Sequence, residues 1–242
     1  NTNTHIIYND EPTEESIHNI DKQIISTNIG LKLALKLGAR YSLKTRADVR
    51  LNKNNLETFL LSLIKTFPVK KNSIIKSRIV VPSLVTYKFR IFSLSDIVMF
   101  GDTNDLLIYF KDEKYKQGLK EFGLNEKNIL INDTPLIPEI FLCSRYLKKI
   151  EGNISWNLDA WWKSLKDYFC IIDNSSLDLF WYKYNWEFEY RNIRTYADKF
   201  ARGVDFQDWL SLYNEFENNW KLASKEHERY NNQVKLLNIF KN

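Results

Sequence analysis

The sequence predicts an α/β fold in which an open mixed sheet is flanked by helices and followed by an aromatic-rich, largely helical C-terminal part. Short β-prone segments alternate with segments whose apolar residues recur at three and four positions, the spacing of an amphipathic helix. The length of 242 residues suits one such domain with an appended lobe. All seven tryptophans follow residue 150, so we expect a ligand-binding domain over residues 1–150. Residues 151–242 should form a hairpin and helices packed on that domain.

The first fifty residues predict a strand, a helix and a second strand. Residues 5–8 are β-prone, and apolar residues recur with helical spacing from 16 to 37. Gly38 follows as a natural left-handed cap of that helix. The first half of residues 41–51 is β-prone and should form the central strand. The order strand, helix, strand favours a parallel βαβ unit.

The rest of the chain predicts further helices and strands. Apolar periodicity, Pro68 after a helix, and Asp102 or Asn104 as a helix cap set most of the boundaries. The expected helices span residues 56–67, a short stretch ending at 110, 138–146 and 204–220, with a mixed helix and loop over 111–126 and a charged helix from 222. The expected strands span residues 74–81, 94–100, 168–173 and 177–184, the last two forming a hairpin.

The charge distribution narrows the class of protein. The formal net charge is +5, and cations gather between Arg40 and Arg90, where Asp48 and Glu57 are the only acids. Such a basic patch suits an anionic small molecule, an anionic membrane face or nucleic acid, and the alternative is a set of scattered surface lysines. The aromatic residues cluster away from the patch and no nucleic-acid reader motif is present, which argues against nucleic acid.

Cysteine usage and hydropathy indicate a reducing compartment and no membrane span. Cys143 and Cys170 lie in apolar contexts without metal-type spacing, which predicts buried reduced thiols. No apolar run is long enough to cross a bilayer, and no signal peptide is present. We therefore expect a soluble, cytoplasmic protein. The aromatic stripe around Trp209 and Trp220 is typical of packing, with binding of sugars or of a lipid interface as the alternative.

After its β-prone first half, the stretch 41–51 places three cations, Lys44, Arg46 and Arg50, around the carboxylate of Asp48. In open α/β sheets, ligands bind at the carboxyl edge of the strands. Phosphates would meet the cations there, and a divalent metal could bridge Asp48 to the same phosphates. The alternative is a solvated loop with surface ion pairs.

The motifs that are missing also narrow the chemistry. No phosphate-binding glycine loop, no Gly-x-Ser-x-Gly elbow and no Cys/His zinc cluster occurs in the chain. Two further carboxylates, Asp96 and Glu139, lie near the ends of a predicted strand and a predicted helix. With the cations they suit transfer from a diphosphate-activated donor, in which a carboxylate deprotonates an acceptor hydroxyl. A contact with the helix dipole is the alternative role of Glu139.

Four stretches, in order along the chain, carry a resemblance to a known family. They are NIDKQIIST at residues 19–27, LKTRADVRL at 43–51, FSLSDIVMFG at 92–101, and Pro138-Glu139. Over about residues 5–150 the sequence resembles the WavE family of bacterial lipopolysaccharide and capsule synthesis proteins. The resemblance implies a GT-A-like glycosyltransferase, cytoplasmic or peripheral at the inner membrane. It would transfer a sugar from a nucleotide-diphospho-sugar donor to a saccharide or lipid-linked saccharide acceptor of a growing surface polysaccharide.

The same resemblance implies roles for single residues. Asp48 would bind a divalent metal, Mn or Mg, and the donor diphosphate, with Lys44 and Arg46 beside the phosphates. Glu139 would be the catalytic base, and Asp96 would bind the acceptor or the donor sugar at the catalytic centre. The residues of the preceding helix that would face the nucleotide-sugar are Asn19, Lys22 and Gln23.

The sequence departs from the pattern of that fold in two places. Its usual pair of acids is replaced by Asp48-Val-Arg50, so Arg50 would supply part of the metal's charge. The first nucleotide-binding strand and helix should precede residues 5–8, so we expect them to be missing or disordered. Two other functions remain open: transfer of a polyol phosphate or sugar phosphate in capsule assembly, and a non-catalytic subunit whose basic patch holds a partner enzyme or an anionic membrane.

Overall fold

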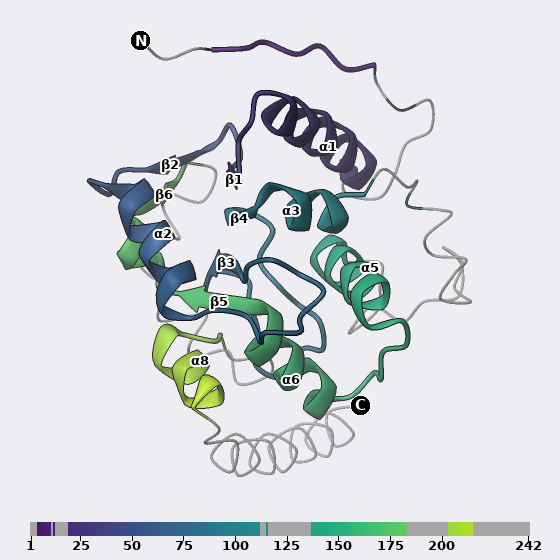
Figure 1. Cartoon of the computed structure of the whole chain (residues 1–242), viewed down its shortest axis with the longest axis vertical. Helices are drawn as coiled ribbons and strands as arrows, with labels where there is room; N and C mark the ends of the chain where they lie inside the picture. Colours follow the sequence, from purple (N-terminus) through teal and green to yellow (C-terminus); the bar gives the residue numbers. More distant parts are fainter. Residues whose placement is uncertain are drawn as a thin grey trace, which may run out of the picture.

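The computed structural model describes residues 4–10, 12, 19–111, 115, 137–182 and 203–214 (Figure 1). The described strands form a four-stranded sheet with the order β1-β4-β3-β5 and a two-stranded sheet of β2 and β6. β4 is antiparallel to β1 and β3, whereas β3 is parallel to β5, so the predicted mixed sheet is confirmed. The strands are β1 Tyr41–Lys44, β2 Val49–Leu51, β3 Ile79–Pro82, β4 Met99–Asp102, β5 Phe169–Ile172 and β6 Leu179–Trp181.

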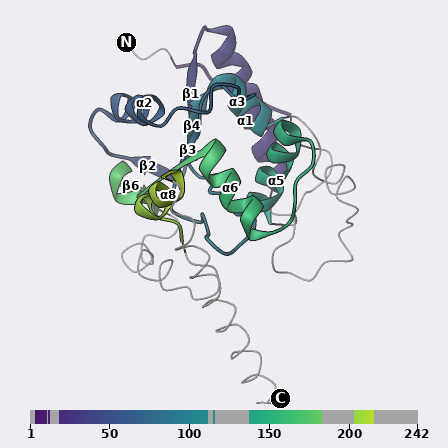
Figure 2. The same ribbon diagram turned by 60° about the horizontal axis from the view of Figure 1, so that its bottom comes forward.

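The described α-helices are arranged around the four-stranded sheet, as the two views in Figures 1 and 2 show. α1 packs against α3, α3 packs against α5, and α6 and α8 pack against β5. Every residue of β3, β4 and β5 is buried, so the core lies around these strands. The helices are α1 Ile20–Lys36, α2 Leu56–Thr66, α3 Thr103–Tyr109, α5 Pro138–Glu151, α6 Leu158–Tyr168 and α8 Phe206–Tyr213, with a 3-10 helix, η2 Asn174–Leu177.

The helices whose ends carry local signals form where the sequence predicts them. α1 is followed by Gly38 in a left-handed conformation (φ 84°), as expected for a helix cap. α3 begins after Asp102, whose carboxylate accepts a hydrogen bond from the backbone amide of Asn104 at 2.9 Å. Pro138 takes the first position of α5, which continues beyond the predicted end at residue 146.

The predicted strand over residues 5–8 is wrong, because this segment pairs with no described strand. Ile6 is 76% exposed and Tyr8 is 91% exposed, and the segment runs along the outside of the molecule (Figure 1). The parallel βαβ unit expected from it is therefore not formed either. β1 is antiparallel to β4 and lies at the end of the described sheet, not at its centre. Local β-propensity does not say which partner a strand will find.

The strand predicted in the first half of residues 41–51 forms as β1. β1 ends at Lys44, and the chain turns before β2 leaves for the second sheet, where Val49 lies opposite Trp181. The strands predicted at 74–81 and 94–100 begin later, as β3 and β4. Residues 94–98 are buried although they pair in no sheet, and they include the polar residues Ser95 and Asp96.

The hairpin predicted over residues 168–184 is wrong, because β5 and β6 belong to different sheets. η2 joins them, and Asp178 after it has a positive φ of 47° that redirects the chain. β5 and β6 pair with strands from the first 150 residues, while the division at residue 150 stays a prediction. Parts of several predictions fall on residues outside the described part: 16–18 of the first predicted helix, most of 111–126, 183–184 of the predicted hairpin, 215–220 of the helix predicted over 204–220, and the tail from 222.

Helix α6 was not predicted, although its start carries a signal. Asn157 caps it by accepting a hydrogen bond from the backbone amide of Ala160 at 2.8 Å. Trp161 and Leu165, four positions apart, are fully buried on one side. The charged residues Lys163, Lys166 and Asp167 interrupt the apolar pattern.

The described tryptophans of the C-terminal part serve mainly in packing. The indole nitrogens of Trp161 and Trp209 donate to the backbone carbonyls of Tyr87 at 2.9 Å and Leu165 at 3.1 Å, and both rings are fully buried. The ring of Phe67 meets that of Trp209 edge-on at 5.0 Å. The two cysteines are buried free thiols, as predicted. Within the described ranges, no helix is both long enough and apolar enough to cross a membrane.

Candidate functional site

An open cleft of about 880 Å³ lies where β1 ends. Its walls come from the start of α1, the turn between β1 and β2, the segment before β4, the start of α5, and the end of β6. Its lining residues are Asn19, Lys22, Gln23, Ser26, Thr27, Lys44, Thr45, Arg46, Ala47, Asp48, Asp96, Ile137, Pro138, Glu139 and Trp181. Polar side chains from distant parts of the sequence therefore face one space.

One wall carries a buried lysine, Lys44, at the last position of β1. Its ammonium donates to the backbone carbonyl of Asp96 and lies 5.5 Å from the centre of the Phe110 ring. Burial lowers the pKa of Lys44, and the nearby negative charge of Asp96 opposes that shift. A buried cation beside a cleft favours an anionic ligand, which restores the solvation that the charge has lost.

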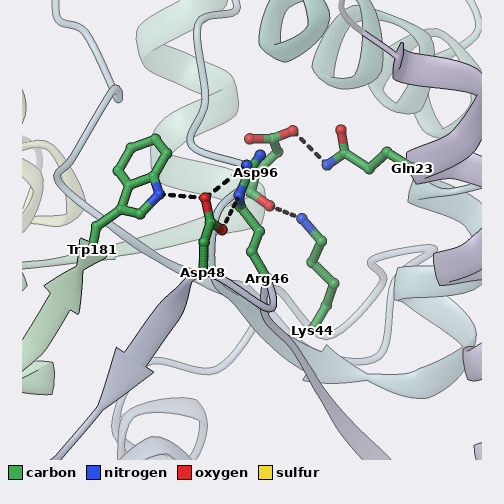
Figure 3. Close-up of polar contacts among 6 residues, drawn as sticks. All are labelled: Gln23, Lys44, Arg46, Asp48, Asp96 and Trp181. Carbon is green, nitrogen blue, oxygen red and sulfur yellow. Dashed lines mark hydrogen bonds and ion pairs between the residues drawn. The ribbon is translucent and has the colours of Figure 1, made fainter. Parts of the chain in front are cut away.

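The turn after β1 holds a cluster of three side chains that Figure 3 shows in close contact. Arg46 donates from Nε to Oδ1 of Asp48 at 2.9 Å and from Nη2 to Oδ2 at 3.2 Å. The indole nitrogen of Trp181 donates to Oδ2 of the same carboxylate at 2.8 Å. The hydrogen bonds from Arg46 are the main reason that the pKa of Asp48 is lowered to about 2. Asp48 is therefore ionised at any pH near neutrality.

Two more carboxylates, Asp96 and Glu139, line the same cleft. Asp96 accepts a hydrogen bond from the side-chain amide of Gln23 on α1 at 2.5 Å (Figure 3). Glu139 is half-buried at the second position of α5. Burial, with the negative charge of Asp96 as the next cause, raises the pKa of Glu139 to about 7. A carboxylate with such a pKa exchanges protons near neutral pH, as a general base must.

The structure brings together the predicted site residues with one exception. Asn19, Lys22 and Gln23 of α1 share the cleft with the other predicted residues, namely Lys44, Arg46, Asp48, Asp96 and Glu139. Arg50 does not line it and is exposed on β2. The exception follows from strand geometry, since Val49 points into the core and Arg50 therefore points to the other side.

Two groups of lining residues were not predicted. Ser26 and Thr27 lie one turn after Lys22 and Gln23 on α1, so helical spacing could have found them. Trp181 reaches the cleft because β6 pairs with β2, and no local signal predicts that pairing.

The residues at Asp48 do not fit a divalent metal well. Three hydrogen bonds already occupy its carboxylate, two of them from a guanidinium cation that would repel the ion. In the part of the chain that the structure describes, no group of three His, Cys, Asp or Glu residues could hold a metal.

The described residues form an α/β protein with cations and carboxylates in one open cleft, a combination that suits a charged ligand. A family model described as WavE lipopolysaccharide synthesis matches residues 2–238, so the chain belongs to this family and takes part in lipopolysaccharide synthesis. The match extends well beyond residues 5–150, where the sequence resemblance was concentrated. No curated protein and no solved structure matches the chain.

Proposed function

We propose that this protein is a glycosyltransferase that moves a sugar from a nucleotide-diphospho-sugar to a growing surface polysaccharide, in particular lipopolysaccharide. The observation that carries the proposal is the composition of the cleft. Lys44, Arg46 and Glu139, whose pKa is about 7, line the same space. Membership of a lipopolysaccharide synthesis family supports the same reading.

The cations Lys44 and Arg46 suit the diphosphate of the donor. A guanidinium binds two phosphate oxygens at once, and an ammonium adds a second positive charge. Both stabilise the charge that the diphosphate gains as it leaves. The cleft volume of about 880 Å³ lies within the range of about 300–1,000 Å³ that is common for small-molecule sites. Asn19, Lys22 and Gln23 of α1 would then contact the nucleotide-sugar.

The carboxylates of Asp96 and Glu139 suit the acceptor. In a direct displacement, the acceptor hydroxyl oxygen bonds to the anomeric carbon, and the bond from that carbon to the diphosphate oxygen breaks. The nucleoside diphosphate leaves with the electron pair, and the carboxylate of Glu139 takes the hydroxyl proton. This step inverts the anomeric centre. Asp96, held by Gln23, would orient the acceptor or the transferred sugar.

The acceptor and the cellular location follow from the same proposal. The growing polysaccharide would be presented as a saccharide or on a lipid carrier, and a GT-A-like arrangement would serve both substrates. We place the reaction in the cytoplasm, with the basic patch between Arg40 and Arg90 in peripheral contact with the anionic inner membrane.

A transfer assay tests the proposal. The full chain is incubated with a panel of nucleotide-sugars and lipopolysaccharide acceptors, and acceptor-dependent release of nucleoside diphosphate is measured. Replacing Glu139 by Gln should lower that rate by about 10²–10⁴-fold, the usual contribution of a general base. Asp159→Asn is the matched control, because Asp159 is also a carboxylate in the first turn of a helix and is exposed on α6. A folded Glu139→Gln variant with wild-type activity would contradict the proposal.

A further inference from the structure

We infer that Arg46, held in place by Asp48 and Trp181, binds the donor diphosphate without a divalent metal. Asp48 and Trp181 are then positioning residues, and neither is a metal ligand. The inference rests on the proposed function, because it assumes that a diphosphate binds in this cleft.

The guanidinium of Arg46 is restrained from two directions. The Asp48 carboxylate contacts the edge formed by Nε and Nη2, at 2.9 Å and 3.2 Å. The indole of Trp181 lies beneath the guanidinium, with 5.4 Å from Cζ to the ring centre. Fork-like pairing and stacking on an aromatic face are the two contacts that fix the plane of an arginine side chain.

Trp181 restrains the carboxylate as well as the guanidinium. Its Nε1 donates to Oδ2 of Asp48 at 2.8 Å, and its backbone lies opposite Val49 in the β2–β6 pair (Figure 3). Only 7% of Trp181 is exposed, so the ring has little freedom to move. The plane and position of Arg46 are therefore set before a ligand arrives, which reduces the entropy lost on binding.

The same contacts leave little room for a metal. A divalent ion at Asp48 would compete with the guanidinium of Arg46, which already donates to both carboxylate oxygens. A metal in a diphosphate site bridges and neutralises phosphate oxygens. Arg46 and Lys44 bring two positive charges to this part of the cleft against the one negative charge of Asp48, so a net positive charge meets the phosphates without a metal.

The test measures binding of inorganic pyrophosphate to the full chain by calorimetry, once with excess EDTA and once with excess magnesium. We expect the same Kd in both. Arg46→Lys keeps the positive charge but removes the planar guanidinium and its paired hydrogen bonds, and it should weaken binding about tenfold or more in both conditions. Arg40→Lys is the matched control, because Arg40 also stacks on an aromatic ring, that of Tyr41 at 5.1 Å, but lies outside the cleft. Its Kd should not change.

The positioning role has its own readout. Trp181→Phe removes the donor to Asp48 without changing the charge of the cleft, so it isolates positioning from electrostatics. We expect affinity to fall severalfold in the wild-type background and not to fall further in Arg46→Lys. An equal loss in both backgrounds would show that Trp181 does not act through Arg46 and would overturn the positioning role.

Comparing pyrophosphate binding in EDTA with binding in magnesium distinguishes failure of this inference from failure of the proposed function. Binding of pyrophosphate that appears only with magnesium would overturn the inference and leave the proposed function in place. No binding of pyrophosphate or of any nucleoside diphosphate, in either condition and with a folded protein, would overturn both.

Discussion

Gln23 on α1 donates a hydrogen bond to Oδ2 of Asp96 at 2.5 Å, and so fixes one of the carboxylates that line the cleft. Asp96 lies just before β4, in a buried segment without strand pairing. Its negative charge is the second cause, after burial, of the raised pKa of Glu139. The two carboxylates are therefore electrostatically linked, and this linkage can be tested.

Asp96→Asn should lower the pKa of Glu139, because removing a nearby negative charge makes ionisation of the second carboxylate easier. The midpoint of the pH dependence of transfer should then shift to lower pH, whatever happens to the maximal rate. The measurement is the rate of nucleoside diphosphate release between about pH 5 and 9. An unchanged midpoint would show that the two groups are not linked.

Wild-type activity should rise with pH through a midpoint near the pKa of Glu139, about 7. The base must be ionised to accept the acceptor proton, so activity is lost as pH falls below that value and not as it rises above it. Glu139→Gln should remove this rising limb and leave a low, flat profile. A wild-type profile that falls between pH 6 and 8 would contradict the role of base.

Lys44→Met should weaken pyrophosphate binding about tenfold while changing the free energy of unfolding by less than about 1 kcal/mol. The side chain is buried, and burial lowers its pKa, so its charge costs stability that an apolar side chain of similar size would not. Binding calorimetry and denaturant unfolding measure the two effects separately. If stability falls sharply and affinity does not, Lys44 is a structural residue.

Asp105→Ala should lower the free energy of unfolding by about 2–4 kcal/mol, because two backbone amides lose their acceptor. Oδ2 of Asp105 accepts from the amides of Lys76 and Ser77, both at 2.9 Å, and its side chain is buried on α3. Denaturant unfolding checks this value. Asp159→Ala, on the exposed side of α6, is the control and should change stability by less than about 0.5 kcal/mol.

Local signals predicted much of the helical structure and most of the cleft. Gly38, Asp102 and Pro138 mark helix boundaries through contacts within a few residues, so these boundaries can be predicted from the sequence alone. Asn19, the N-cap residue of α1, precedes Lys22 and Gln23 by three and four positions, a spacing that favours one side of the helix. These residues could be assigned to a single site before the fold was known.

Strand pairing could not be predicted in the same way, because it depends on residues far apart in the chain. The segment at residues 5–8 has strand propensity but no partner among the described strands, and residues 41–51 contribute to two sheets. The contact between Trp181 and Asp48 depends on the register of β2 with β6. Arg50 was assigned to the cleft because it lies two residues from Asp48 in the sequence, but β2 directs its side chain away from the core.

The central claim is that the cleft binds the nucleoside diphosphate of a sugar donor. The most direct measurement is a thermal-unfolding screen of the full chain with nucleoside diphosphates and nucleotide-sugars, since a ligand that binds only the folded state raises the midpoint. We predict that nucleotides of one base raise the midpoint, that Arg46→Lys reduces the shift, and that Arg40→Lys preserves it. A midpoint that no nucleotide changes, or a shift that is unaltered in Arg46→Lys, would contradict the claim.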